Sequence, residues 1–491
     1  MTASLDLKPA LCPALFLAGP SSGQGKTTVT AALARLLKSQ GKVVRVFKTG
    51  PDYLDPQILE QASGQAVEQL DIWMAGEAYC RQRLYDAAQV ADFILVEGAM
   101  GLFDGEPSSA DLAACFGIPI AVVMDVKGMA QTAAAIMKGL ANFRDDISVV
   151  GLIANGCSTA RHTELIRDAL SCCKKESSKQ DSLQKVPSQE ISSVETPLLA
   201  TFARDASVAL PERHLGLVQA SEARSLLEER FDAGAISLNQ GLQMPLEQLF
   251  PMVKFSAELT AQAPIQKCLS GLKIAVAKDE AFSFIYQANL DLLTQMGASY
   301  EFFSPLHDEC LPDADGLWLP GGYPELHADM LAKNTTMIES ITQFYASDRP
   351  ILAECGGFLY CLETLVDLED NSHVMLGLLA GQGAMKGKRG CQGMQTAVLP
   401  EGEVRGHAHH RSRSAVIQEP ISYARRQRHT APGESIYRNK GLTASYLHLF
   451  FPSNPNAIGD IFSLSASLAS SLTEGSNNCV PNPLKETDYV G

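Results

Sequence analysis

The sequence predicts an α/β protein built from two doubly wound domains, and three observations carry this prediction. Residues 14–155 alternate apolar, strand-like runs with helix-like stretches. The same alternation starts again at residue 271, after a boundary near 255–270. A glycine-rich loop joins the first apolar run to the first helix-like stretch. Alternation of this kind is typical of a mainly parallel sheet covered by helices.

The elements of the first half follow in a regular order. Five apolar runs are expected to form buried parallel strands: "ALFLAG", "KVVRVFKTG", "ADFILVEGA", "IPIAVVMDV" and "VVGLIANG". "TTVTAALARLLKSQG" and "GMAQTAAAIMKGLANF" are expected to form helices between them. Residues 171–197 are polar and poor in aromatic residues, which predicts a flexible surface insertion. "PLLATFARD" then resumes as a strand, and we place this domain at residues 1–255.

The second half repeats the pattern, and we place its domain at residues 271–452. Strands are expected in "LKIAVAKDE", "SYEFFSP", "GLWLPGG" and "PILAEC". Helices are expected in "IYQANLDLLTQMG", "MIESITQFYAS" and "FLYCLETLV". Residues 453–491 show no sustained hydrophobic period, so we expect a poorly ordered tail.

Composition limits the classes of function. The chain has 491 residues and a formal net charge of −15, which argues against a protein that binds the nucleic-acid backbone. No apolar run approaches the ~20 residues of a membrane-spanning helix. The N-terminus lacks the pattern of a secretory signal, and the cysteines include no C-x-x-C pair. We therefore expect a cytoplasmic protein with reduced thiols and with neither a nucleic-acid nor a membrane partner.

The glycine-rich loop has the context of a phosphate-binding loop. It follows an apolar strand and precedes a helix, and its backbone N–H groups can face phosphate oxygens at the helix N-terminus. Five residues, rather than the usual four, separate Gly19 from Gly25. Lys26 can supply a charge for the β- and γ-phosphates, and the Thr27 hydroxyl can ligate Mg²⁺. The predicted nucleotide-binding residues are Ser22, Gly23, Gln24, Gly25, Lys26, Thr27 and Thr28.

Two further motifs place carboxylates directly after predicted strands, where ligand sites of open α/β sheets lie. "FKTGPDYLDP" carries Lys48, Asp52, Tyr53 and Asp55, and an Asx turn around its prolines is the alternative explanation. "ILVEGAMGLFDG" ends its strand at Glu97, which we interpret as a ligand of Mg²⁺ or of its water. Asp104 of the same motif can equally serve as a turn residue. The predicted metal ligands are Thr27, Asp52 and Glu97.

The motif "PILAECGGFLY" raises the question of whether Cys355 is a nucleophile or a buried core thiol. Its strand, tight turn and helix have the form of a nucleophile elbow, and the helix N-terminus is expected to lower the thiol pKa. "LWLPGGYPE" offers backbone N–H groups at Gly321 and Gly322 for an oxyanion. His448 in "ASYLHLFF" is either a core residue or the general-base partner of Cys355.

Three histidines in "RGHAHHRSR" form a further cluster. His407, His409 and His410 could bind a metal, although no acidic or cysteine partner accompanies them. A loop that faces solvent or an anion is the alternative.

These motifs together resemble those of the cobyrinic acid a,c-diamide synthases, a family of the corrinoid (vitamin B12) pathway. The resemblance spans roughly residues 14–450. It rests on "SSGQGKTT", "FKTGPDYLDP", "VEGAMGLFDG", "LPERHLGL", "KDEAFSFIY", "LPGGYPELHA" and "AECGGFLY". It implies an N-terminal domain similar to dethiobiotin synthetase. It also implies a C-terminal, flavodoxin-like class I glutamine amidotransferase domain.

The resemblance implies an ATP-dependent ligase that amidates the a and c acetate carboxylates of cobyrinic or hydrogenobyrinic acid. ATP and Mg²⁺ would activate the carboxylate as an acyl phosphate, and glutamine would supply the nitrogen. Asp52, Asp55 and Glu97 would belong to the metal and activation site, with Lys48, Tyr53 and Asp104 beside them. Cys355 and His448 would release ammonia with Gly322 at the oxyanion, and Asn155 would contact the adenine.

The chain departs from the family pattern at two places. Amidotransferases of this class carry a carboxylate two residues after the histidine, where this chain has Phe450. A Cys–His dyad is therefore expected. The family segment "GHEFHYS" reads "GHAHHRS" here, so that Ala408, His409 and Arg411 replace its acid, phenylalanine and tyrosine.

Two alternative functions stay open at this point. One is the same chemistry on Ni-sirohydrochlorin. The other is a regulatory P-loop ATPase whose amidotransferase-like domain is not catalytic. The sequence also leaves open whether the chain forms a homodimer.

Overall fold

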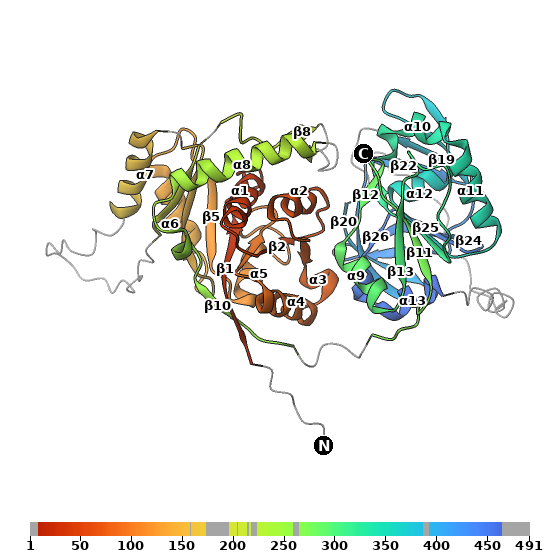
Figure 1. Ribbon diagram of the computed structural model, residues 1–491, viewed down its shortest axis with the longest axis horizontal. Coiled ribbons are helices and arrows are strands. Elements are labelled where there is room, and N and C mark those ends of the chain that lie inside the picture. The colour runs from red at the N-terminus through yellow and green to blue at the C-terminus, as the bar shows by residue number, and fades with distance from the viewer. Residues whose placement is uncertain are drawn as a thin grey trace, which may run out of the picture.

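The computed structural model describes residues 8–157, 159–172, 196–203, 205–213, 216–217, 223–258, 265–385 and 392–463. Two α/β domains lie side by side, the first drawn from red to yellow-green and the second from green to blue (Figure 1). Both predicted α/β domains are confirmed. The predicted insertion at 171–197 lies largely outside the described residues.

The first domain is built on a sheet in the order β3-β2-β4-β1-β5-β6-β7, whose strands all run parallel. β10 adds an antiparallel pairing to the start of β1. The strands are β1 (Ala10–Ala18), β2 (Val44–Thr49), β3 (Glu68–Leu70), β4 (Phe93–Glu97), β5 (Ile120–Asp125), β6 (Val149–Asn155), β7 (Leu198–Phe202) and β10 (Met252–Phe255). A short hairpin joins β8 (Glu212–Arg213) to β9 (Gly216–Leu217).

Helices cover both faces of this sheet and form two hydrophobic cores. One core lies under α1 (Lys26–Ser39), α2 (Leu54–Ser63), α8 (Arg224–Gly241) and the 3₁₀ turn η2 (Leu246–Leu249). The opposite core lies under α4 (Glu77–Val90), α5 (Ser109–Phe116), α6 (Gln131–Asn142) and α7 (Ala160–Cys172). The short α3 (Ile72–Ala75) precedes α4. Because both sheet faces are covered, the central strands β4, β1 and β5 are apolar up to their carboxyl ends.

The second domain contains a ten-stranded sheet in the order β13-β11-β14-β16-β25-β24-β23-β20-β21-β26. Its first five strands are parallel, as predicted, and the rest are antiparallel. The strands are β11 (Lys273–Ala277), β13 (Ser299–Phe303), β14 (Gly316–Leu319), β16 (Ile351–Glu354), β20 (Gln392–Leu399), β21 (Gly402–His409), β23 (Ser422–Arg426), β24 (Pro432–Asn439), β25 (Leu442–Ser445) and β26 (His448–Leu449).

Smaller sheets and helices complete this domain. β12 (Phe282–Phe284) pairs with β15 (Gly321–Gly322), and a second sheet has the order β18-β17-β19-β22. Its strands are β17 (Leu362–Val366), β18 (Ser372–Val374), β19 (Leu379–Met385) and β22 (Ser412–Val416). The helices and turns are α9 (Gln287–Gln295), η3 (Pro324–Leu326), α10 (Ala328–Lys333), α11 (Thr335–Ala346), α12 (Gly356–Cys361), η4 (Phe451–Ser453) and α13 (Pro455–Phe462).

Two sequence predictions about this domain are wrong in part. "FLYCLETLV" is helical only to Cys361 and continues as β17. The poorly ordered tail does not begin at 453, because α13 packs the buried side chains of Ile458 and Phe462 into the core. Asn454 caps this helix by accepting a hydrogen bond from the Ala457 amide at 3.2 Å. The rest of the tail, from 464, lies outside the described residues.

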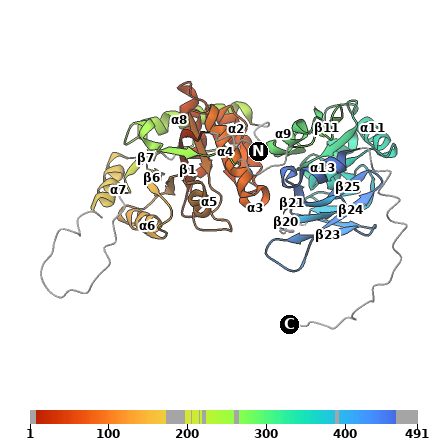
Figure 2. The ribbon, with the colours of Figure 1, turned by 90° about the horizontal axis from the view of Figure 1, so that it is seen from below.

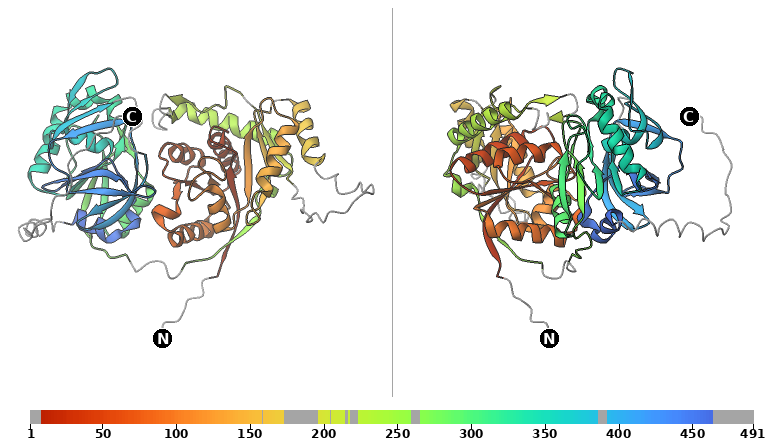
Figure 3. Two further views of the ribbon diagram at one scale, coloured as in Figure 1. Left: turned by 180° about the vertical axis from the view of Figure 1, so that it is seen from behind. Right: turned by 45° about the vertical axis from the view of Figure 1, so that its right-hand side comes forward.

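The two domains meet along one interface, and the views in Figures 2 and 3 agree on their side-by-side placement. A buried cluster of side chains from both domains forms its apolar part: Tyr53, Met74, Tyr286, Ala288 and Phe450. Polar contacts flank it. Gln57 Nε2 donates to the Ser283 carbonyl at 2.9 Å, and the Arg405 guanidinium donates to the Trp73 carbonyl at 2.6 Å. The two sets of motifs are thereby brought face to face.

Candidate active site

The phosphate loop has the predicted strand–loop–helix context between β1 and α1. Gly23 and Gly25 have φ values of 78° and 84°, which glycine adopts without steric cost. The Lys26 ammonium donates to the carbonyl of Ser21 at 3.1 Å and to that of Met100 at 2.6 Å. Burial, followed by the charge of Lys48, lowers the pKa of Lys26. The Lys26 ammonium therefore lies at the phosphate loop, where it is hydrogen-bonded to neutral carbonyl groups.

A group of charged side chains lies beside the loop at the carboxyl ends of β2 and β4. The parallel register places Lys48 directly beside Glu97. The Lys48 ammonium lies 2.7 Å from Glu97 Oε1 and 2.6 Å from Asp55 Oδ2. The Thr27 hydroxyl reaches the same two carboxylates, at 2.8 and 3.2 Å. Burial alone would lower the pKa of Lys48, but the carboxylates of Glu97, Asp55 and Asp52 raise it, so that it is charged.

Asp52 occupies a different position from Asp55. Its Oδ1 accepts from the Leu54 and Asp55 amides at 3.1 and 3.4 Å, at the start of α2, and its Oδ2 lies 4.0 Å from Lys48 Nζ. The structure thus brings Asp55, rather than Asp52, to the Thr27 hydroxyl.

The donor set around Thr27 suits Mg²⁺. Among the described residues, no group of three or more His, Cys, Asp and Glu side chains is arranged around a metal position. However, Thr27, Asp55 and Glu97 supply hard oxygen donors, and Mg²⁺ takes few protein ligands when phosphates are present. Glu97 Oε2 is buried and has no hydrogen-bond partner. An orphaned buried carboxylate oxygen is costly unless a bound group satisfies it.

Asn155 and Asp104 both lie near the loop. Asn155 Nδ2 donates to the Gln24 carbonyl at 2.9 Å, and a Cβ on Gly25 would lie 2.3 Å from that nitrogen. Asn155 therefore supports the loop backbone, while its predicted contact with adenine stays a prediction. Asp104 is exposed, and its carboxylate folds back toward Gly101.

Cys355 occupies the sharp turn that the sequence predicts. It lies between β16 and α12 with φ 47° and ψ −102°, a strained conformation for a residue with a side chain. Its amide donates to the Ser445 carbonyl at 2.8 Å, which ties the turn to β25. Strain of this kind at a strand-to-helix turn is typical of a nucleophile elbow.

The expectation of a lowered thiol pKa is wrong for this structure. Burial raises the pKa of the Cys355 thiol, and the nearby Glu325 carboxyl raises it further, although a hydrogen bond from the Gly356 amide opposes both. α12 has only six residues, so its N-terminus offers little field against this desolvation. The structure therefore holds a protonated thiol.

His448 lies beside Cys355 on the last strand of the sheet. A Cβ placed on Gly321 would lie 2.2 Å from His448 Cε1 and 3.3 Å from Cys355 Cβ, so both side chains flank the same glycine. Both ring nitrogens of His448 are buried without a hydrogen-bond partner. Burial, together with the neighbouring histidines, holds the pKa of His448 well below its usual value. The imidazole is thus a neutral base next to the thiol.

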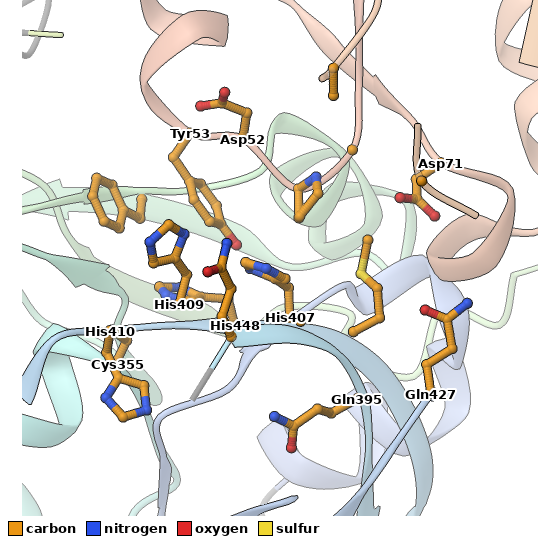
Figure 4. A pocket seen from close by; sticks show the side chains of 18 of the residues that line it. Asp52, Tyr53, Asp71, Cys355, Gln395, His407, His409, His410, Gln427 and His448 are labelled. Atoms are coloured by element: carbon orange, nitrogen blue, oxygen red, sulfur yellow. The ribbon is translucent and has the colours of Figure 1, made fainter. Parts of the chain in front are cut away.

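One cleft of about 920 Å³ between the domains is lined by residues from motifs of both domains (Figure 4). Asp52 and Tyr53 enter it from the first domain, and Cys355 and His448 enter it from the second. The lining from the second domain also includes Tyr323, Glu325, Met394, Gln395, His407, His409, His410, Arg411, Arg426, Gln427, Arg428 and His429. The carboxylate group of one domain and the thiol of the other therefore face a common space.

Comparison with known proteins agrees with this arrangement. Residues 15–195 match the CobQ/CobB/MinD/ParA nucleotide binding domain, and residues 273–456 match the CobB/CobQ-like glutamine amidotransferase domain. The chain is 46% identical to a hydrogenobyrinate a,c-diamide synthase of Stutzerimonas stutzeri, over 91% of this chain and 97% of that protein. It is 42% identical to a cobyrinate a,c-diamide synthase of Herminiimonas arsenicoxydans, over 91% and 96%. The chain belongs to the cobyrinate a,c-diamide synthase family.

The side chains of His407, His409 and His410 are not arranged around a common metal position. His410 stacks on Tyr446 with ring centroids 3.7 Å apart, and its Nε2 lies 3.1 Å from Glu434 Oε1. His407 pairs with His448 across β21 and β26, and burial lowers its pKa to about 3. The segment 407–411 thus forms one wall of the cleft, and Arg411 is part of its lining. A wall that faces an anion fits these observations better than a metal cluster.

Sequence reasoning missed one buried carboxyl group in the synthase's second domain. Glu354 precedes Cys355, and burial raises its pKa to about 8. Its Oε1 accepts from the Leu449 amide at 2.8 Å, and its Oε2 accepts from Trp318 Nε1 at 3.0 Å. Glu354 therefore holds the strand that carries His448 and does not contact the imidazole. Only its position between an apolar strand and Cys355 could have indicated it.

Glu354→Gln should weaken the hydrogen bonds by which Glu354 holds the strand of His448. A glutamine side chain has one carbonyl oxygen for the two N–H donors, so one donor stays buried and unpaired, at a cost of about 1–3 kcal/mol. We expect a lower thermal unfolding midpoint and slower use of glutamine, with synthesis from added ammonia retained. Calorimetry and the two activity assays measure this. An unchanged midpoint together with unchanged glutamine use would contradict the assignment.

Gly356 lies against the predicted oxyanion site of the synthase. A Cβ on Gly356 would lie 2.9 Å from the Gly322 nitrogen and 2.9 Å from Pro324 Cδ. Both are tighter than ordinary contacts, and the first involves a backbone N–H that we expect to face the oxyanion. Gly356 therefore allows the two glycine amides to approach Cys355 together.

Gly356→Ala should lower glutamine-driven activity by about 10²–10³-fold, the usual loss when an oxyanion donor is displaced. Synthesis from added ammonia should continue. Gly139→Ala on α6 is the matched control, because a Cβ there meets no atom within 4 Å. Equal effects of the two substitutions, measured by glutamate release, would argue against this role of Gly356.

Proposed function

We propose that this protein catalyses the ATP-dependent amidation of the a and c acetate carboxylates of cobyrinic or hydrogenobyrinic acid, with glutamine as the nitrogen donor. The single observation that carries the proposal is the common cleft, which is lined by Asp52 and Asp55 of the first domain and by Cys355 and His448 of the second. Asp55 in turn bonds to Thr27 of the phosphate loop. The names of the relatives supply the substrate class. Amide formation in this cleft belongs to cobalamin biosynthesis.

The first domain makes the substrate carboxyl group reactive. A carboxylate oxygen attacks the γ-phosphorus of ATP, ADP leaves, and an acyl phosphate forms. The Lys26 ammonium and the loop amides stabilise the charge on the transferred phosphoryl group. Thr27, Asp55 and Glu97 would hold Mg²⁺, which neutralises phosphate charge when bound. Lys48, fixed between the carboxylates, keeps them close together.

The second domain releases ammonia from glutamine. Cys355 Sγ attacks the side-chain carbonyl carbon, and its proton passes to His448, which is neutral in this structure. The amides of Gly322 and Gly356 stabilise the oxyanion. The C–N bond breaks, ammonia leaves with the proton from His448, and water hydrolyses the thioester to glutamate. Ammonia then attacks the acyl phosphate in the same cleft, phosphate leaves, and the amide is formed.

The walls of the cleft suit a large, multiply charged acid. A volume of about 920 Å³ is at the upper end of small-molecule sites. Although the net charge of the chain is −15, the second domain presents Arg411, Arg426 and Arg428 to the cleft. The Arg428 guanidinium also donates to the Glu106 carbonyl of the first domain, at 2.9 Å. These arginines can pair with substrate carboxylates that are not being amidated.

One assay tests the proposal. Purified protein is incubated with ATP, Mg²⁺ and glutamine. Cobyrinic acid, hydrogenobyrinic acid or Ni-sirohydrochlorin is added in separate reactions, and the products are identified by mass spectrometry. We expect two carboxyl-to-amide conversions on a corrinoid. Conversion of Ni-sirohydrochlorin alone would favour that alternative substrate. ATP and glutamine turnover with no amide on any tetrapyrrole would overturn the proposal in favour of a regulatory ATPase.

A further inference from the structure

Tyr53 connects the two reaction sites directly. It belongs to the first domain, yet its ring lies against aromatic side chains of the second. The ring centroids of Tyr53 and His448 are 4.9 Å apart, and those of Tyr53 and Tyr286 are 4.5 Å apart. Phe284 stacks on Tyr53 at 5.0 Å with an interplanar angle of 14°. Only 9% of the surface of Tyr53 is exposed, so the contact is a packed one.

These contacts replace the usual means of holding a catalytic histidine. Phe450 stands where amidotransferases of this class have a carboxylate, and neither nitrogen of His448 has a hydrogen-bond partner. The imidazole is instead enclosed by Gly321 on one side and by the rings of Tyr53 and Phe284 on the other. A side chain of the first domain therefore determines how His448 is packed and how much water reaches it.

The backbone of Tyr53 is continuous with the phosphoryl-transfer site. Tyr53 is the residue before α2 (Leu54–Ser63), whose second residue, Asp55, bonds to Thr27 and Lys48. Asp52, on the other side, accepts from the first amides of the helix. A ligand that shifts the start of α2 through Asp55 would therefore also shift the backbone of Tyr53.

The packed arrangement leaves the imidazole of His448 without partners. Both of its ring nitrogens are buried and lack hydrogen-bond partners. Such groups are costly in a resting structure and are satisfied once water or substrate reaches them. The packing of Tyr53 against His448 is therefore suited to give way to a second arrangement, in which water or substrate reaches these polar atoms.

We propose that Tyr53 is a coupling residue, which covers His448 while the first domain holds no activated carboxylate and withdraws when that site is filled. In the covered state the Cys355–His448 pair is kept from water and from productive proton transfer. Glutamine is then hydrolysed only when an acyl phosphate is ready for the ammonia. The amide part of this inference rests on the proposed function, whereas glutamate release does not.

The test compares Tyr53→Leu with Tyr53→Phe in the full-length protein. Glutamate release is measured without ATP and tetrapyrrole, and the ratio of glutamate released to amide formed is measured with both. Tyr53→Leu should raise glutamate release and this ratio at least about fivefold, the lower end of typical coupling between sites. Tyr53→Phe keeps the ring that covers His448 and should therefore raise glutamate release and the ratio less than Tyr53→Leu does. The ratio is independent of how much protein folds.

Tyr79→Leu is the matched control. Tyr79 packs on Phe450 across the same interface, with centroids 5.8 Å apart, and does not contact His448. An unchanged ratio in Tyr53→Leu, an equal rise in Tyr79→Leu, or loss of glutamine use in Tyr53→Leu without uncoupled release would each overturn the proposal. If the wild type forms no amide, the proposed function fails, but glutamate release still tests Tyr53.

Discussion

Lys26→Ala should stop amide formation from glutamine and from added ammonia alike. Both nitrogen sources need the same activated carboxylate, and Lys26 is the cation of the phosphate loop, held at the Ser21 and Met100 carbonyls. Removing a charge that stabilises phosphoryl transfer costs about 10³-fold or more. We therefore expect both rates to fall by at least this factor in assays of amide product by mass spectrometry.

The control for Lys26→Ala is Lys42→Ala. Lys42 is exposed and follows α1, so its loss changes net charge equally without touching the loop. It should leave both rates within about twofold of the wild type, as surface substitutions usually do. Ammonia-driven synthesis that survives in Lys26→Ala would mean that the loop is not the site of carboxylate activation.

Cys355→Ala should separate the two half-reactions. Without the Sγ nucleophile no thioester forms, so glutamine use should fall below detection. The carboxylates and phosphate loop belong to the other domain, so synthesis from added ammonia should persist. Glutamate release and amide formation are measured on the same preparation with each nitrogen source.

Cys361→Ala is the matched control for this experiment. Cys361 is a fully buried cysteine at the end of the same helix and lies outside the cleft lining. Its removal should reduce stability, as loss of a small core side chain does, and leave glutamine use in place. Loss of ammonia-driven synthesis in Cys355→Ala would show that the cysteine also serves the synthetase site, which the account does not allow.

Much of the synthetase site could be predicted because it depends on local order in the sequence. Carboxyl ends of parallel strands meet at one edge, so the motifs that follow the two strands were expected at the same edge of the sheet. The register places Lys48 beside Glu97. The sequence did not indicate whether Asp52 or Asp55 lies at the Thr27 hydroxyl. It depends on how α2 begins, where Asp52 accepts from the first helix amides and Asp55 turns toward Thr27.

The features that the sequence could not predict depend on tertiary packing. The elbow of Cys355 is a local turn and was predicted, but the pKa of its thiol depends on burial, which is set by distant chain segments. The role of Glu354 depends on the approach of Leu449, and the contact of Tyr53 with His448 depends on how the domains dock. The spacing of residues along the chain indicates neither of these two contacts.

The central claim is that glutamine-derived nitrogen travels within one cleft from Cys355 to the activated carboxylate. The most direct measurement supplies [amide-¹⁵N]glutamine together with an excess of unlabelled ammonium chloride and reads ¹⁵N in the amide product by mass spectrometry. The account predicts a ¹⁵N fraction well above that of the mixed ammonia pool in solution. A ¹⁵N fraction equal to that of the pool would contradict it, because the nitrogen would then have left the protein before reacting.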